Sequence, residues 1–130
     1  RVKFLQQDLR KKLGIMAERL SVGIVYTTPT SPRFSNGVTV FSITSPRRTI
    51  NHQELYNYLY GKKGERNRFA VGFIPEKTTG NPRPESLRIC PHIMNLPSQI
   101  TSVVLKIATF INPRHNITRE ELEVITLQEA

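Results

Sequence analysis

Two runs of β-branched and aromatic residues lie close together in the chain: Ser21-Val22-Gly23-Ile24-Val25-Tyr26-Thr27-Thr28 and Val38-Thr39-Val40-Phe41-Ser42-Ile43-Thr44. Such residues favour the extended conformation, so both runs predict strands. Pro29 ends the first run, and Asn36-Gly37, a strong turn-forming pair, precedes the second. Because the runs are close in sequence, we expect them to pair as an antiparallel hairpin.

Two further strands are expected later in the chain. Aromatic and β-branched side chains alternate over residues 69–74, and Pro75 ends that run. Residues 76–86 are polar and contain Pro and Gly, which predicts an exposed loop. Residues 87–90 then predict a short fourth strand.

The first twenty residues predict an amphipathic helix, because apolar side chains recur at spacings of three and four. This apolar stripe consists of Val2, Leu5, Leu9, Leu13, Met16 and Leu20. The basic residues off the stripe are Arg10, Lys11, Lys12 and Arg19. Gly14 weakens a helix by about 1 kcal/mol relative to Ala, so the helix has an alternative end at that position.

A second helix is expected from Thr49 or Asn51 to residue 60. Asn51 and Glu54 have the spacing of a capping box, and Gly61 suits the position just after a helix end. The helix carries three tyrosines, at positions 56, 58 and 60.

Two more helices are expected near the C-terminus. The most apolar one starts at Asn95 or Ser98, ends before Pro113, and is expected to cover a sheet. Thr118 and Glu121 form a capping box that predicts a short last helix, with Leu122 and Ile125 on its inner side.

This order of elements predicts the α+β class: a small, mainly antiparallel sheet of three to four strands with helices packed on one face. A chain of 130 residues fits a single domain. We divide it into an N-terminal helix over 1–20, an α/β body over 21–112 and a short acidic C-terminal helix over 118–130. The opposite face of the sheet is then solvated, covered by a partner or used for binding.

The charge of the chain is strongly basic and unevenly distributed. It has 19 Lys and Arg against 10 Asp and Glu, a formal net charge of +9. The first 118 residues carry 18 of the basic and 6 of the acidic side chains, whereas the last twelve carry 1 and 4. A basic body with a short acidic tail is typical of a protein that binds a polyanion, most often nucleic acid.

Turns and helix ends hold the candidate phosphate contacts. Thr30-Ser31-Pro32-Arg33 and Thr44-Ser45-Pro46-Arg47 are the same tetrapeptide, one after each strand of the expected hairpin. Proline stiffens such a turn, and a guanidinium pairs bidentately with phosphate oxygens. The two arginines are expected to lie ~20 Å apart at opposite hairpin ends, so they would share only an extended ligand.

Further basic residues flank the second helix and the polar loop. The full candidate set is Arg33, Arg47, Arg48, Lys62, Lys63, Arg66, Arg68 and Arg83, with Tyr58 as a base-stacking residue. The alternative role of the basic residues is structural: a solvated side chain on an ordinary turn, or a favourable charge at a helix C-terminus. For the tyrosine, the alternative is a place in the core.

Signatures of catalysis and of metal binding are missing from the sequence. Asp8 is the only aspartate, and the histidines His52, His92 and His115 are isolated. Two-metal sites need several converging carboxylates, so we expect no metal, no cofactor and no enzyme activity. The single Cys90 cannot form an internal disulfide, and we expect it to be a small residue on a buried strand.

These observations favour a non-enzymatic nucleic-acid-binding module, for DNA or RNA alike. The alternative is a protein–protein interaction domain of a larger chain or assembly that docks on an acidic partner. The chain begins at Arg1 rather than Met, which we interpret as a piece of a longer protein. Low cysteine content indicates an intracellular protein of the cytoplasm or nucleus, and the absence of a long apolar run predicts no membrane association.

Overall fold

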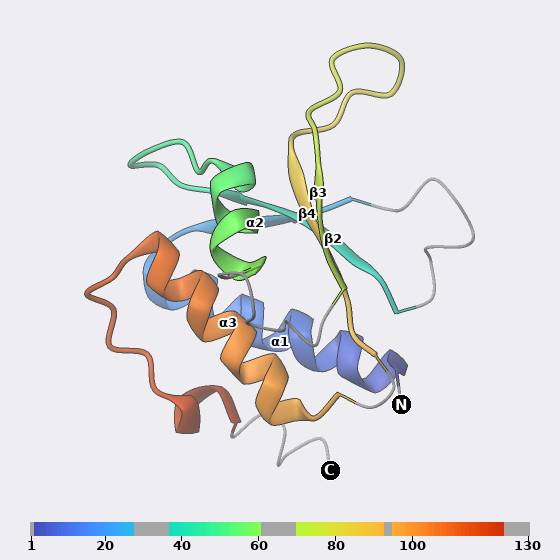
Figure 1. Ribbon diagram of the computed structural model, residues 1–130. Coiled ribbons are helices and arrows are strands. Elements are labelled where there is room, and N and C mark those ends of the chain that lie inside the picture. Colours follow the sequence, from blue (N-terminus) through green and yellow to red (C-terminus); the bar gives the residue numbers. More distant parts are fainter. Residues whose placement is uncertain (1, 28–36, 61–69, 93–94, 124–130) are drawn as a thin grey trace.

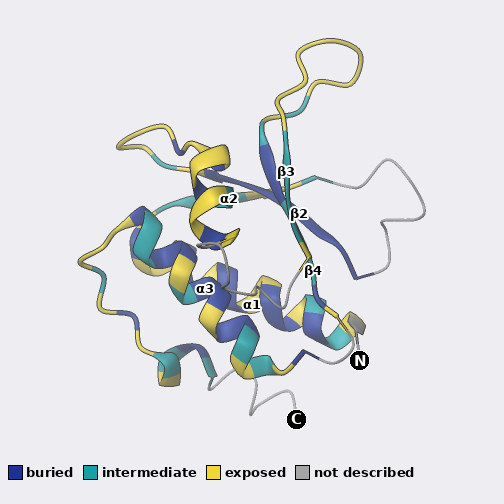
Figure 2. Cartoon of the chain, in the orientation of Figure 1, coloured by how far each residue is buried: buried dark blue, intermediate teal, exposed yellow. Residues whose placement is uncertain are grey.

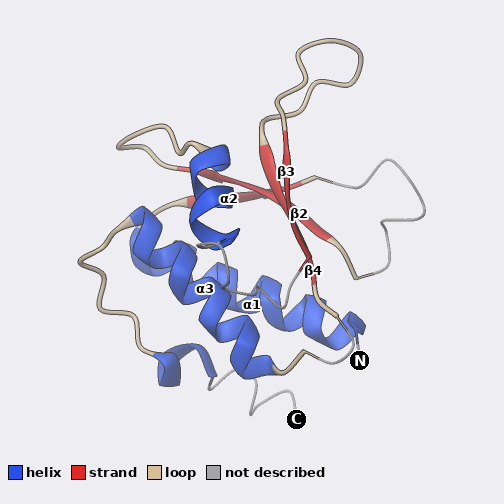
Figure 3. Ribbon diagram, viewed as in Figure 1, coloured by secondary structure: helices blue, strands red, loops and turns tan. Residues whose placement is uncertain are grey.

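In the computed structural model of the chain, residues 2–27, 37–60, 70–92 and 95–123 are described. The elements in chain order are α1 (Val2–Leu20), β1 (Gly23–Tyr26), β2 (Thr39–Thr44), α2 (His52–Tyr60), β3 (Ala70–Ile74), β4 (Ser86–Cys90) and α3 (Pro97–Ile111). A short helical segment over residues 119–123 follows. Figures 1 and 3 show the helices gathered beside a strongly twisted sheet, which confirms the predicted α+β class.

The four strands form one antiparallel sheet in the order β1-β2-β4-β3. β1 pairs with β2, which confirms the predicted hairpin, and β3 pairs with β4 as a second hairpin. The two hairpins are joined by only three residue pairs between β2 and β4, from Thr39↔Ile89 to Phe41↔Leu87. Beyond Phe41 the two central strands diverge.

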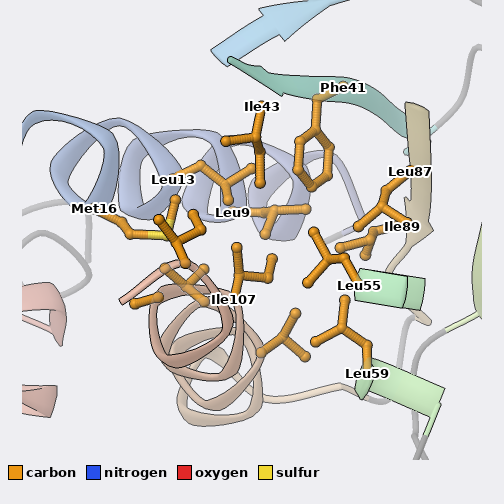
Figure 4. Packing of buried hydrophobic residues seen from close by; sticks show 14 of the residues in the cluster. Leu9, Leu13, Met16, Phe41, Ile43, Leu55, Leu59, Leu87, Ile89 and Ile107 are labelled. Carbon is orange, nitrogen blue, oxygen red and sulfur yellow. The ribbon is translucent and has the colours of Figure 1, made fainter. Parts of the chain in front are cut away.

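The hydrophobic core lies between one face of this sheet and the helices (Figure 4). Alternation along the strands turns Phe41, Ile43, Leu87 and Ile89 toward the helices, and all four side chains are buried. The helices contribute Leu9, Leu13, Met16, Leu55, Leu59 and Ile107 to the same cluster. Burying each such side chain stabilises the fold by about 1.5–3 kcal/mol.

The helices approach the sheet to different extents. The backbone of α1 approaches β1, and that of α2 approaches β3 and β4, whereas α3 packs mainly against α1 and α2. The buried apolar side chains of α3 belong to the same core cluster as those of α1 and of the strands.

Lys12 also departs from expectation, since it is completely buried rather than placed on a polar face. Its Nζ donates to Oδ2 of Asp8 at 2.7 Å and to the carbonyl oxygen of Pro97 at 3.1 Å. Asp8 is 2% exposed. The buried charge is thus paired one turn away on α1 and hydrogen-bonded to the first residue of α3, which satisfies it inside the core.

α1 passes through Gly14 without interruption and ends at Leu20. Ser21 follows with a φ of 54°, the left-handed conformation that commonly terminates helices. The alternative helix end at Gly14 is therefore excluded. At the far end of the chain Leu122 is fully buried, as expected, while Ile125 lies outside the described residues.

The outer face of the sheet, away from the helices, carries mostly small side chains. The strand register places Val40, Ser42, Gly72 and Arg88 on this face. A Cβ at position 72 would lie 3.0 Å from Nη2 of Arg88, so glycine leaves room for that guanidinium. Cys90, on the same face, is only half-buried, which corrects the expectation of a buried thiol. Arg88 is the one charged side chain on the described strands.

Candidate nucleic-acid interface

The candidate site forms where β2 and β4 diverge. After Phe41 the strand β2 has no ladder partner in β4, so the backbone N–H of Ile43 needs another acceptor. His52, the first residue of α2, supplies it: its Nε2 lies 2.9 Å from the nitrogen of Ile43. Because a main-chain N–H can only donate, Nε2 accepts and the ring proton is on Nδ1.

Glu85 holds the other side of the His52 ring. Its Oε1 accepts the backbone N–H of His52 at 2.8 Å and lies 3.1 Å from Nδ1. The first of these bonds is the main cause that lowers the pKa of the Glu85 carboxyl below its ordinary value, against an opposing effect of burial. A carboxylate is also favoured at a helix N-terminus. His52 and Glu85 therefore bridge β2, α2 and the segment that precedes β4.

A cleft of about 560 Å³ opens at this divergence. Ser42, Thr44 and Ser45 form one wall, residues 48–52 another, and Glu76, Pro84 and Glu85 the third. Its size falls within the roughly 300–1,000 Å³ of ligand pockets. Since both nitrogens of His52 are engaged, the imidazole is not placed to act as a proton acceptor for a bound ligand.

Arg47 and Arg48 stand on the exposed loop between β2 and α2 (Figure 2). Nη2 of Arg47 donates to the carbonyl oxygen of Leu20, the last residue of α1, at 2.6 Å. Nη2 of Arg48 donates to Ile111, the last residue of α3, at 3.0 Å, and to Phe110 at 3.3 Å. Each guanidinium is therefore anchored by one nitrogen on a helix C-terminus, where a cation is favoured.

This anchoring leaves part of each guanidinium for other partners. A guanidinium has five N–H donors, and the helix carbonyls are the only acceptors of these two side chains among the described residues. Both residues are exposed. An arginine that is already held in place loses less conformational entropy when it binds a phosphate than a freely moving one.

Aromatic rings continue this surface from Arg48. Its guanidinium carbon lies 6.0 Å from the centre of the Phe110 ring, and the Tyr58 ring lies 5.7 Å from Phe110. Tyr58 is 43% exposed, so it is not a core residue. Arg48, Phe110 and Tyr58 thus form a continuous charged and aromatic surface, which we call the Arg48–Tyr58 surface.

Arg83 lies apart, on the long connection between β3 and β4 that projects from the body in Figure 1. Its backbone pairs with Lys77 as an isolated antiparallel bridge, and Gly80 has a φ of 71°. Lys77 and Arg83 line a second cleft, of about 440 Å³, and Glu76 and Pro84 line both clefts. Arg83 therefore borders the same end of the molecule as Arg48.

The structure brings together Arg47, Arg48 and Tyr58 of the predicted set, with Arg83 near their end of the fold. The remaining predicted residues, Arg33, Lys62, Lys63, Arg66 and Arg68, lie outside the described residues.

The roles of Glu85, His52 and Phe110 were not predicted from the sequence. Phe110 lies within the apolar helix expected before Pro113, and its half-exposed ring could not be foreseen from the sequence. For the role of His52, the sequence signal was its position directly after the capping residue Asn51.

The described part of the acidic C-terminal segment, up to residue 123, contacts the helices rather than this surface. Glu121 pairs with Arg19 of α1, and this hydrogen bond is the main cause that raises the pKa of Arg19. Arg119 donates to the carbonyl oxygen of Ser98 and to Glu123. The described part of the tail therefore leaves Arg47 and Arg48 uncovered.

Within the described ranges, His, Cys, Asp and Glu side chains nowhere form a group of three that could hold a metal ion. Among the described helices, none combines the length and apolar character that a bilayer crossing requires. Comparisons of the chain with family models, with curated proteins and with solved structures gave no match.

Proposed function

We propose that this protein is a nucleic-acid-binding module without enzyme activity, and that it contacts phosphates through Arg47 and Arg48. The observation that carries the proposal is the pair of exposed arginines, each anchored on a helix end, beside the exposed aromatic rings of Phe110 and Tyr58. Arginine donors bind phosphate oxygens, and exposed rings stack on unpaired bases. The net charge of +9 adds long-range attraction.

The arrangement favours single-stranded nucleic acid. Stacking on Tyr58 or Phe110 requires a base that is free of a duplex. Sequence-independent phosphate contacts would supply most of the affinity and make it depend strongly on salt.

The test is fluorescence anisotropy with labelled single- and double-stranded DNA and RNA across a salt series. We expect binding that weakens linearly on a log–log plot, and at least tenfold weaker binding by the double variant Arg47→Gln/Arg48→Gln. The matched control is Lys3→Gln/Lys106→Gln, which removes the same charge from exposed positions on α1 and α3. It should bind nearly as well as the unchanged protein.

Because the two arginines also cap helices, the variants need a check of folding by circular dichroism. Arg47→Lys/Arg48→Lys keeps the charge but loses the guanidinium fork, and we expect intermediate affinity. If the unchanged protein binds no nucleic acid at low salt, the proposal is wrong. The basic surface would then serve an acidic protein partner, which co-purification with the tagged protein would identify.

A further inference from the structure

The wall of the cleft between β2 and β4 presents one carboxylate oxygen in a fixed position. Both hydrogen bonds from His52 go to Oε1 of Glu85, which fixes the plane of the carboxylate. Among the described residues, no donor lies within hydrogen-bonding distance of Oε2. The Glu85 side chain is 36% exposed and lines the cleft.

The chemistry of this oxygen is that of an acceptor only. The backbone N–H of His52 lowers the pKa of the Glu85 carboxyl, which therefore stays ionised at neutral pH. An ionised carboxylate cannot donate a hydrogen bond. A ligand group facing Oε2 must consequently offer an N–H or O–H, and a carbonyl oxygen in that place would be repelled.

Arg48 lines the same cleft and links it to the proposed phosphate contacts. Its guanidinium is held by the carbonyl oxygens of Phe110 and Ile111, at the edge of the Arg48–Tyr58 surface. The ring of Pro84 is exposed and offers a flat apolar contact on the opposite wall. The cleft thus combines a cation for a phosphate, an apolar wall for a ring and a fixed acceptor for a donor group.

We propose that this cleft receives one unstacked base of a bound single strand, and that Glu85 selects a base with an exocyclic amino group, cytosine over thymine or uracil. The inference rests on the proposed function and adds a base preference to it. The N4 amino group of cytosine donates to a carboxylate, whereas thymine and uracil present the O4 carbonyl at that position. Thr44 and Thr49, also on the walls, offer hydroxyl groups to the remaining base edge.

The experiment compares oligo-dC and oligo-dT of equal length by fluorescence anisotropy at one salt concentration. Two pyrimidines keep ring size the same, and the comparison varies the group at C4 together with the N3 proton and the C5 methyl group of thymine. We expect the unchanged protein to bind oligo-dC about tenfold more tightly, because a hydrogen bond to a charged group is among the stronger ones.

The decisive variant is Glu85→Gln. Glutamine keeps a carbonyl oxygen for the two His52 donors but places an amide N–H₂ where Oε2 was. The ratio of the two affinities should therefore fall to one or invert in favour of oligo-dT, with the salt dependence unchanged. Glu54→Gln is the matched control, because it removes one acidic charge from an exposed position of α2 outside the cleft, and its ratio should equal that of the unchanged protein.

A second measurement does not rely on any variant. Titration of ¹⁵N-labelled protein with CMP should shift the amide signal of His52, which reports on the Glu85 carboxylate, and UMP should not shift it. Equal binding of oligo-dC and oligo-dT, or a Glu85→Gln variant with an unchanged ratio, overturns the base site while the proposed function stands. Failure to bind any nucleic acid overturns both.

Discussion

Nζ of Lys12 lies 2.7 Å from Oδ2 of Asp8 inside the hydrophobic core, with 0% of the lysine side chain and 1% of the aspartate side chain exposed. The pair connects two helices, since the same Nζ donates to the carbonyl oxygen of Pro97 at the start of α3. Two charges removed from water in this way are tolerated only while each satisfies the other.

Removing one partner of this pair should therefore be costly. We expect Lys12→Met to destabilise the fold by about 3–5 kcal/mol, because it removes the cation that lies 2.7 Å from the buried carboxylate of Asp8. The measurement is urea unfolding followed by circular dichroism. The double variant Lys12→Met/Asp8→Asn removes the buried charge and should recover part of the loss. Equal stability of the single variant and the unchanged protein would contradict the buried pair.

Glu85 should make the stability depend on acid pH. Its pKa is lower in the folded state than the ordinary value of 4.5, so the unfolded chain takes up the proton first as the pH falls. The stabilisation is fully present above about pH 4.5 and is lost as the pH falls through the lower, folded pKa. We expect Glu85→Gln to flatten the plot of unfolding free energy against pH between pH 5 and 3. Parallel plots for the two proteins would refute this role.

Each anchored arginine should contribute separately to the salt dependence of nucleic-acid binding. A phosphate contact adds about one unit to the slope of log affinity against log salt concentration. We expect Arg47→Gln and Arg48→Gln each to reduce that slope by about one, measured by anisotropy titrations at several salt concentrations. Lys106→Gln, on an exposed face of α3, should leave the slope nearly unchanged, and an equal reduction there would indicate diffuse attraction instead.

Tyr58 should matter for single strands and not for duplexes. Base stacking on an aromatic side chain is worth about 1–3 kcal/mol, so we expect Tyr58→Ala to weaken single-strand binding by about fivefold to a hundredfold. Duplex binding, which offers no free base, should change little. Tyr60→Ala is the control, because that ring is 61% exposed but packs on Tyr56 rather than on Phe110. An equal loss in both variants would remove the specific role of Tyr58.

The described part of the C-terminal segment should behave as part of the core. Leu122 is 0% exposed and belongs to the main hydrophobic cluster. We expect Leu122→Ala to lower the unfolding free energy by about 2–5 kcal/mol, measured by urea unfolding, because a buried leucine leaves a cavity. Glu121→Gln, which breaks only the exposed pair with Arg19, is the control and should change stability little.

Residue patterns within short stretches of the sequence predicted most of the fold. The β-branched runs placed the β1–β2 hairpin, and Asn51 was correctly identified as a cap, since its Oδ1 accepts the backbone N–H of Glu54 at 3.0 Å. These features depend on neighbours within a few residues. Contacts between distant segments were not predictable: the burial of Lys12 depends on Pro97, and the packing of α3 depends on where α1 lies.

In the candidate site, too, local features were predictable and contacts between distant segments were not. Charge and turn chemistry pointed to Arg47, Arg48 and Tyr58 without revealing what holds them. The anchors of the two arginines come from α1 and α3, and the partner of His52 comes from the loop before β4. Nothing in the local sequence around Glu85 distinguishes it from a solvated loop residue. Its role follows from the divergence of β2 and β4, which only the tertiary structure contains.

That divergence also has a consequence for how the chain folds. Each hairpin pairs strands that are close in sequence, whereas the seam between them joins Thr39 to Ile89 and carries only three residue pairs. Local pairings form quickly, and distant ones wait for the closure of a long loop. We therefore expect the two hairpins to form early and the closure of the seam to limit the folding rate. The bond from Ile43 to His52 joins residues only nine apart, so it can fix α2 beside the seam before the seam closes.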